Sequence, residues 1–454
     1  MSFKSVNPAD GNTIREVDAF THEQLESTLQ SVADATADWK VRAIEERCAL
    51  MQEAAAVLRK HVDEYAEIIV QEMGKPITEA RAEVEKCGLV CDYYAETGPR
   101  FLADEIIETD AGRSLVAFQP LGTVLAVMPW NFPFWQVFRF AAPTLVAGNT
   151  GLLKHASNVP LCALAIESVF HEAGFPDGVF RTLMIQSSRV ADVIADPRVH
   201  AVTLTGSEPA GREVAATAGA NIKKSLLELG GSDPFIVLED ADLELAVHDG
   251  ITSRFLNTGQ SCIAAKRFIL VEAIAEEFLQ RFKAAVESLP FGDPMDPDTR
   301  VGPLARIDLR DALHHQVIDS IAAGAVPVTG CNPEARDGAW YQPSILDRVA
   351  PGMCAWSEEL FGPVALVIRA RDEADAIRIA NITDFGLGGS VWTADSARGE
   401  RIARQIDCGC AFVNGMVKSD PRLPFGGVKH SGYGRELSQL GIREFVNAKT
   451  IWIR

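Results

Sequence analysis

The apolar run Val124-Leu125-Ala126-Val127-Met128 opens a series of strand-length segments that alternate with helical stretches. Later segments of strand length are residues 151–154, 180–184 and 199–205, and helical stretches are residues 135–147, 161–173 and 210–218. This alternation predicts an α/β fold, in which helices cover both faces of a parallel sheet. Open sheets of this kind bind ligands at the carboxyl ends of their strands, so the loops that follow these strands are candidate sites.

The pattern changes on both sides of this series. Residues 21–98 carry apolar side chains at helical spacing, with a break at Gly74-Lys75-Pro76. After Asn221 a second alternation of strands and helices begins, which predicts a second α/β domain. The tail, residues 445–454, alternates with period two. Together with residues 114–118 it predicts a β arm that pairs with another subunit.

The composition limits the class of protein. The 454 residues are 47% hydrophobic and 23% charged, as in globular proteins. A net charge of -19 argues against nucleic acid and anionic membrane surfaces as partners. The most apolar stretch, residues 121–148, is interrupted by prolines and an arginine and is a poor membrane span. No set of His and Cys residues has the spacing of a metal site.

The nine cysteines lack the spacing of a disulfide framework, and the first eight residues lack the apolar core of a signal peptide. We therefore expect a reducing, cytoplasmic location.

One cysteine lies in the stretch Asn257-Thr258-Gly259-Gln260-Ser261-Cys262-Ile263-Ala264-Ala265, between an amphipathic segment and a strand-like run. Loops held by rigid elements commonly display reactive groups. Gly259 permits a close backbone approach, and the small neighbours leave space around the sulfur. A thiolate attacks carbonyl carbon readily, so Cys262 is a candidate nucleophile. The alternative is a small buried hydrophobic residue, as most free cysteines are.

Two polar residues interrupt apolar runs in places that suit catalysis. Glu228 ends the run Leu226-Leu227-Glu228, where desolvation would raise its pKa towards that of a useful base. The alternative is a surface carboxylate at a turn. Asn131 is the one amide in Pro129-Trp130-Asn131-Phe132-Pro133, and its NH₂ group suits an oxyanion donor. The alternative is structural capping of the turn.

The loop Thr205-Gly206-Ser207-Glu208-Pro209-Ala210-Gly211 leaves a strand and opens a helix, which favours anion binding. It is not the G-x-G-x-x-G fingerprint, and an ordinary strand–helix turn explains it equally well. Lys154 ends an earlier strand, where it is placed either to reach ribose or phosphate or simply to be solvated.

Five motifs occur in order along the chain: Trp130-Asn131-Phe132-Pro133, Leu227-Glu228-Leu229-Gly230-Gly231, Gly259-Gln260-Ser261-Cys262, Glu359-Leu360-Phe361-Gly362-Pro363 and Pro424-Phe425-Gly426-Gly427-Val428-Lys429. In these motifs the sequence resembles the NAD(P)-dependent aldehyde dehydrogenase superfamily over essentially its whole length. The resemblance implies a Rossmann-type cofactor domain (1–98 and 121–226), an α/β catalytic domain (227–430) and a small β oligomerisation arm (99–120 and 431–454). It also implies a homodimer or homotetramer.

The resemblance further implies a role for each matching residue. Cys262 attacks the aldehyde, Asn131 and the Cys262 backbone N–H hold the oxyanion, and Glu228 activates the water that hydrolyses the thioester. The residues implied to bind NADP or NAD are Pro129, Trp130, Lys154, Ser157, Gly206, Ser207, Gly211, Leu229, Glu359 and Phe361. Relatives selective for NAD often carry a glutamate three residues after the lysine. Ser157 lacks that charge, so we expect tolerance of NADP.

Arg139 lies eight residues after Asn131 in an otherwise apolar helical run, where burial is costly unless an anion pairs with it. It matches the arginine that succinate-semialdehyde dehydrogenases use to grip the substrate carboxylate, and the surrounding sequence resembles a bacterial subgroup of those enzymes. The implied substrate is an aldehyde with a distal carboxylate, foremost succinate semialdehyde. The other implied substrate contacts are Phe132, Ser419 and Phe425.

Alternatives remain open at this stage. A structural salt bridge at Arg139 would fit a broad-specificity aldehyde dehydrogenase, and Leu256 stands where some relatives carry a second arginine. A cysteine hydrolase would use Cys262 and Glu228 without a nicotinamide, but it leaves the cofactor-type loops unexplained. A scaffold protein would have no reason to keep Cys262, Glu228 and Asn131 together.

Overall fold

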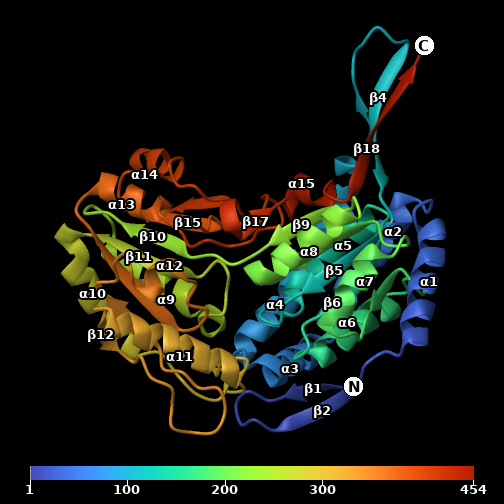
Figure 1. Ribbon diagram of the computed structural model, residues 1–454. Coiled ribbons are helices and arrows are strands. Elements are labelled where there is room, and N and C mark those ends of the chain that lie inside the picture. Colours follow the sequence, from blue (N-terminus) through green and yellow to red (C-terminus); the bar gives the residue numbers. More distant parts are fainter. Residues whose placement is uncertain (1) are drawn as a thin grey trace.

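A six-stranded sheet forms the first half of the computed structural model, which describes residues 2–454 (Figure 1). Its strand order is β17-β9-β8-β5-β6-β7. All neighbours are parallel except the short edge strand β17. The bounds are β5 (Thr123–Met128), β6 (Thr150–His155), β7 (Phe180–Thr182), β8 (Ala201–Thr205), β9 (Lys224–Glu228) and β17 (Gly432–Tyr433). The parallel sheet expected from the apolar runs is confirmed.

Both faces of this sheet are buried, which explains why its strands are continuous apolar runs. On one face, Leu125 and Leu152 pack with helices α1, α7 and α8. On the other, Val124 and Leu153 pack with α2 to α6. The helix bounds are α1 (His22–Trp39), α2 (Ile44–Lys60), α3 (Val62–Met73), α4 (Ile77–Phe101), α5 (Trp135–Val146), α6 (Pro160–Glu172), η1 (Ser187–Arg189), α7 (Val190–Ala195) and α8 (Glu208–Ala220). The predicted break lies between α3 and α4, where Gly74 ends α3 with φ 76°.

A seven-stranded sheet forms the second half, in the order β12-β13-β14-β11-β10-β15-β16. It is parallel except for the β12–β13 pair. The strands are β10 (Asp233–Val237), β11 (Ala265–Val271), β12 (Val326–Thr329), β13 (Ser344–Asp347), β14 (Val364–Ala370), β15 (Gly388–Trp392) and β16 (Cys410–Val413). Along β10, Phe235 and Val237 face one core and Ile236 faces the other, so this sheet is also covered on both sides.

The helices of this half are α9 (Leu243–Phe255), η2 (Leu256–Gly259), α10 (Glu272–Glu287), α11 (Ile307–Ala322), α12 (Cys354–Ser357), α13 (Glu373–Asn381) and α14 (Ser396–Ala403). Helices α9 and α10 supply residues to the core that holds Phe235, and α11, α13 and α14 supply residues to the opposite core. The second α/β unit expected from the sequence is therefore present.

A three-stranded sheet projects from the body as an arm, which Figure 1 shows at the C-terminus. It consists of β3 (Glu105–Ile106), β4 (Arg113–Pro120) and β18 (Val446–Ile453). Strand β18 pairs antiparallel with β4 from Val446↔Pro120 to Ile453↔Arg113. The two segments that the sequence assigned to an arm thus pair with each other within one chain, and their pairing with a second subunit stays a prediction.

The remaining elements are β1 (Ser2–Val6), β2 (Thr13–Asp18), η3 (Lys429–Ser431) and α15 (Ser438–Ile442). The domain boundaries remain predictions, but two of them fall at informative places. The boundary at 226/227 lies inside β9, and β17, from the segment assigned to the arm, completes the first sheet. Within residues 2–454 no helix is both long and apolar enough to cross a membrane.

Candidate active site

The loop that carries Cys262 has an unusual backbone. Residues 256–264, called the Cys262 loop below, connect α9 to β11, and both Asn257 and Thr258 adopt φ 55°. Left-handed backbone is unfavourable for residues other than glycine and persists only where neighbours hold it. Here the Asn257 side-chain amide donates to the Asn131 carbonyl (2.7 Å), and the Asn257 N–H donates to Glu79 Oε2 (2.6 Å). The loop is therefore fixed from two neighbouring elements.

Gly259 lets this loop approach residues 359–363 closely. Its φ is 73°, and a Cβ atom at this position would lie 2.5 Å from the Gly362 carbonyl oxygen. A side chain would thus be excluded by both conformation and space. The sequence predicted that Gly259 lets the backbone approach a ligand, whereas the structure shows that it makes room for another segment of the protein.

Lys266, at the start of β11, is fully buried beside the nucleophile. Its ammonium group donates to the Ser261 and Cys262 carbonyls, each at 2.8 Å, and pairs with Glu359 Oε1 at 2.8 Å. Glu359 in turn accepts a hydrogen bond from the Gly231 N–H (3.2 Å). A buried charge that is fully paired in this way fixes the geometry of the groups around it. Lys266 therefore ties the Cys262 loop to Glu359.

Cys262 itself is half-buried, and burial raises the pKa of its thiol to about 12, although Lys266 and Arg139 act in the opposite direction. In the free protein the thiol is therefore protonated at neutral pH. A nucleophilic step needs a group that removes this proton.

Asn131 lies in the loop after β5 and is buried. Its Nδ2 donates to the Gln260 carbonyl at 3.1 Å, within the Cys262 loop. An amide nitrogen carries two protons, so one remains for an oxyanion formed at the neighbouring cysteine. The geometry thus brings Asn131 to the Cys262 loop, as its proposed role requires.

Glu228 ends β9 and is almost completely buried, and neither carboxyl oxygen has a hydrogen-bond partner. Burial raises the pKa of Glu228 well above its usual range, and the nearby Glu436 raises it further. The group is therefore a proton carrier at neutral pH rather than a permanent anion. A surface position for Glu228 is excluded.

Arg139, on α5, is buried and forms an ion pair with the buried Glu436. Its guanidinium also lies over the Phe425 ring, 4.8 Å from the centroid. The protein itself thus supplies the anion that a buried arginine requires. This arrangement favours the structural alternative for Arg139.

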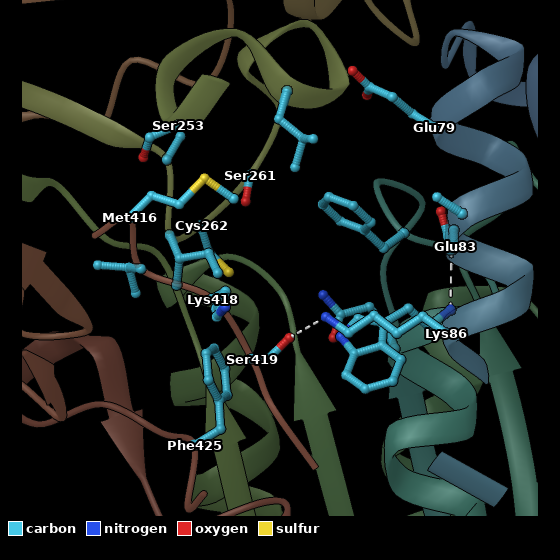
Figure 2. A pocket seen from close by; sticks show the side chains of 18 of the residues that line it. Glu79, Glu83, Lys86, Ser253, Ser261, Cys262, Met416, Lys418, Ser419 and Phe425 are labelled. Carbon is cyan, nitrogen blue, oxygen red and sulfur yellow. Dashed lines mark hydrogen bonds between the residues drawn. The ribbon is translucent and has the colours of Figure 1, made fainter. Parts of the chain in front are cut away.

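A cavity of about 230 Å³ opens beside the predicted nucleophile, and we call it the Cys262 cavity (Figure 2). Its walls include Cys262 and all four predicted substrate contacts, namely Phe132, Arg139, Ser419 and Phe425. Asn131 and Glu228, which are both buried, are not among its lining residues.

The predicted cofactor residues fall in two places. Lys154 ends β6, buried and without an ion-pair partner in residues 2–454, and burial lowers its pKa. It lines a second cavity of about 80 Å³ between α7 and α8, whose walls are mainly apolar. Ser157 is exposed in the turn after β6, and Gly206 and Ser207 precede α8. An apolar slot with an unpaired cation at its edge fits the adenosine part of a dinucleotide.

Gly211 has a packing reason to be glycine, since a Cβ atom there would lie 2.6 Å from the Leu229 side chain. The second group lies nearer the nucleophile, where Trp130 and Phe361 meet edge to face with 5.8 Å between ring centroids. Glu359, already tied to Lys266, belongs to this group, and Pro129 is the link between β5 and Trp130.

Four residues of the site were not found from the sequence. Lys266 was detectable in principle as a charge inside an apolar strand, whereas Glu79, Lys86 and Glu436 sit in segments with ordinary polar patterning. Their places became visible only when distant segments came together around the Cys262 loop.

Comparison with known proteins agrees with this geometry. Residues 1–451 match the model of the aldehyde dehydrogenase family. The chain is 49% identical to a probable succinate-semialdehyde dehydrogenase [NADP(+)] of Synechocystis sp., with all of both chains covered. It is 47% identical to the succinate semialdehyde dehydrogenase [NAD(P)+] Sad of Escherichia coli, covering 99% of this chain and 97% of that one.

Among solved structures, a succinic semialdehyde dehydrogenase from Streptococcus pyogenes in complex with NADP+ superposes with a TM-score of 0.98 at 38% identity, covering 99% of each chain. Together with the two-sheet α/β fold, these matches define an NAD(P)-dependent enzyme of aldehyde oxidation. The chain belongs to the aldehyde dehydrogenase family.

Proposed function

We propose that this protein oxidises succinate semialdehyde to succinate, with NADP+ or NAD+ as the oxidant. The observation that carries the proposal is the Cys262 cavity, in which a thiol shares one small space with three cationic side chains. Such a space suits a short aldehyde with a carboxylate at its far end. The printed names of relatives at 47–49% identity point to the same substrate.

The cofactor would be held by Lys154 and Ser157 at the adenosine end and by Glu359 and Phe361 at the nicotinamide end. Ser157 presents a hydroxyl and no negative charge, so nothing at this position repels a 2′-phosphate. When bound, the nicotinamide supplies a hydride acceptor. The remaining chemistry belongs to the residues of this chain.

In the proposed reaction the Cys262 thiol loses its proton and its sulfur bonds to the aldehyde carbon, giving a thiohemiacetal. The second Nδ2 proton of Asn131 and the Cys262 N–H stabilise the oxyanion. Loss of hydride from that carbon leaves a thioester on Cys262. Addition to sulfur helps this loss, because an alkoxide-like carbon gives up hydride more readily than a free carbonyl.

Glu228 would then take a proton from water, which attacks the thioester and releases succinate and the free thiol. Its buried position supports this role, since a carboxylate with a raised pKa is a stronger base than one in water. The same group could first accept the proton of the Cys262 thiol, whose pKa is also raised by burial, and would pass that proton to solvent before it takes one from water.

The direct test is a panel of aldehydes, each assayed with NADP+ and with NAD+ by the absorbance of the reduced nicotinamide. We expect succinate semialdehyde to have the highest kcat/KM and NADP+ to be accepted. Cys262→Ala should lose turnover and keep cofactor binding, which separates an enzyme from a scaffold. Hydrolysis of esters with no reduced nicotinamide formed from any aldehyde would instead indicate a cysteine hydrolase.

A second candidate is a broad-specificity aldehyde dehydrogenase, which the Arg139–Glu436 ion pair favours because Arg139 is already paired. Equal kcat/KM for succinate semialdehyde and butanal would select this alternative.

Two properties outside the reaction are also proposed. The arm of β3, β4 and β18 would join subunits of a homodimer or homotetramer, since side chains such as Trp452 and Ile453 are about half exposed there. A reducing cytoplasm would suit the nine cysteines, all of which are free thiols.

A further inference from the structure

Three cationic side chains line the Cys262 cavity: Arg139, Lys418 and Lys86. The charges of two of them are stabilised without any ligand. Arg139 is ion-paired with Glu436, and Lys418 is exposed to solvent. Lys86 is the third, and it is neither paired nor fully solvated.

Lys86 extends from α4 across the cavity, and Figure 2 shows its side chain reaching Ser419 from the opposite wall. Its ammonium group donates to Ser419 Oγ at 2.8 Å and lies 4.1 Å from the centroid of the Trp135 ring. In residues 2–454 no carboxylate forms an ion pair with it. A hydroxyl and a ring face leave an ammonium with unused donor capacity.

The acidic side chains Glu83 and Glu79 on the same wall already have other partners. Glu83 is ion-paired with the buried Lys75 and accepts hydrogen bonds from the Phe134 and Trp135 N–H groups at 2.9 and 3.0 Å. Glu79 accepts from Asn257 in the Cys262 loop. Neither carboxylate forms an ion pair with Lys86, and the attraction of Glu83 and Asp420 for its ammonium group acts at longer range.

An ammonium in such a place is poorly stabilised, and burial lowers the pKa of Lys86 to about 8. A carboxylate that enters the cavity would meet the charge that the surroundings lack, next to a hydroxyl able to donate a second hydrogen bond. The same cavity contains the Cys262 thiol, so an aldehyde held at its other end by Lys86 would have its carbonyl directed towards the nucleophile wall.

We propose that Lys86, together with the Ser419 hydroxyl, binds the distal carboxylate of the substrate, while Arg139 serves to neutralise Glu436. This inference rests on the proposed function and deepens it. It names the residue that selects an ω-carboxylated aldehyde over an uncharged one of the same length.

The test compares Lys86→Met, Lys86→Arg and Arg81→Met in the full-length enzyme, with succinate semialdehyde and butanal as substrates. Arg81→Met is the matched control, because it removes a positive charge from the same helix at an exposed residue paired with Asp63. The quantity measured is the ratio of kcat/KM for succinate semialdehyde to kcat/KM for butanal.

Lys86→Met should lower this ratio about 10- to 100-fold, the loss expected for a charge-assisted hydrogen-bonded pair, mainly through a higher KM for succinate semialdehyde. Lys86→Arg should recover most of the ratio, and Arg81→Met should change it less than about threefold. A purely structural role would lower both kcat/KM values alike and leave the ratio unchanged. That result would overturn the proposal, as would a ratio that falls in Lys418→Met but not in Lys86→Met.

A second measurement covers a Lys86→Met protein that folds poorly. Ser419→Ala removes only the hydroxyl partner, and it should raise the KM for succinate semialdehyde while leaving that for butanal unchanged. Equal KM values for succinate semialdehyde in wild type and Ser419→Ala would contradict the proposal. If wild type fails to oxidise succinate semialdehyde with either cofactor, the proposed function fails, whereas wild-type activity with an unchanged ratio in Lys86→Met removes the Lys86 assignment alone.

Discussion

The Arg139–Glu436 ion pair gives the sharpest prediction about stability. Both side chains are buried, so replacing one of them leaves the other charge without a partner. Breaking a buried pair by removing one member costs about 3–5 kcal/mol, whereas removing both charges costs much less. Arg139→Met and Glu436→Gln should therefore each destabilise the protein, and the double variant should be more stable than the sum of the single effects predicts.

The size of the effect follows from the length of the chain. With an unfolding entropy of roughly 2.1 cal/mol/K per residue over 454 residues, a loss of about 3 kcal/mol lowers the thermal midpoint by about 3 °C. Scanning calorimetry of wild type, both single variants and the double variant measures this. Arg189→Met is the control, because its partner Asp192 is exposed and such surface pairs contribute little.

One result would refute this reasoning. Suppose that Arg139→Met melts within about 1 °C of wild type but loses its preference for succinate semialdehyde over butanal. Then Arg139 contacts the substrate, and Glu436 does not need its charge for the stability of the fold. A midpoint in the double variant below that of both single variants would likewise show that the pair is not the main interaction of either residue.

Three further predictions concern single residues. Burial raises the pKa of the Cys262 thiol to about 12, so the rate at which iodoacetamide alkylates it should rise about tenfold per pH unit from pH 7 to 9. Mass spectrometry of the Cys262 peptide from the free enzyme measures this rate, and a plateau below pH 8 would contradict the prediction. Ser157→Glu should lower kcat/KM with NADP+ about 30-fold or more and change that with NAD+ less than threefold, and equal losses would argue against a 2′-phosphate at this position. Burial raises the pKa of Asp233 to about 7, so the folded state binds a proton that the unfolded state has lost, and stability falls as pH rises from about 4 to 7. The unfolding free energy of Asp233→Asn minus that of wild type should therefore rise by about 2–3 kcal/mol between pH 5 and pH 8, as measured by calorimetric scans. If this difference stays constant over that range, Asp233 does not titrate there.

The central strands were predictable because strands that are buried on both faces appear in the sequence as continuous apolar runs. The run at residues 124–128 matches β5, which spans Thr123–Met128. The exposed hairpin of β1 and β2 leaves no such record, since β2 buries none of its residues and is held by backbone pairing to β1. Strands β13 and β16, of four residues each, were not predicted from the sequence.

Some residues of the candidate site were also predictable from the sequence, and others were not. Cys262, Glu228 and Asn131 stood out because a reactive or polar group interrupts a small-residue or apolar run. The partner of Arg139 did not, because Glu436 is almost 300 residues away and nothing local marks it. Lys86 resembles its exposed neighbour Glu85 in the helical pattern, and only the packing of α4 against the Cys262 cavity distinguishes them.

Strand β17 has a consequence for biosynthesis. It pairs Gly432 with Glu228, so the edge of the first sheet beside the proposed base is closed by a segment about 200 residues further along the chain. A nascent polypeptide that has not yet reached this segment exposes an unpaired strand edge, the kind of surface on which nascent chains associate. The segment that covers the proposed base therefore also protects the first sheet from association, and variants that weaken the β17–β9 pairing should favour aggregation during synthesis.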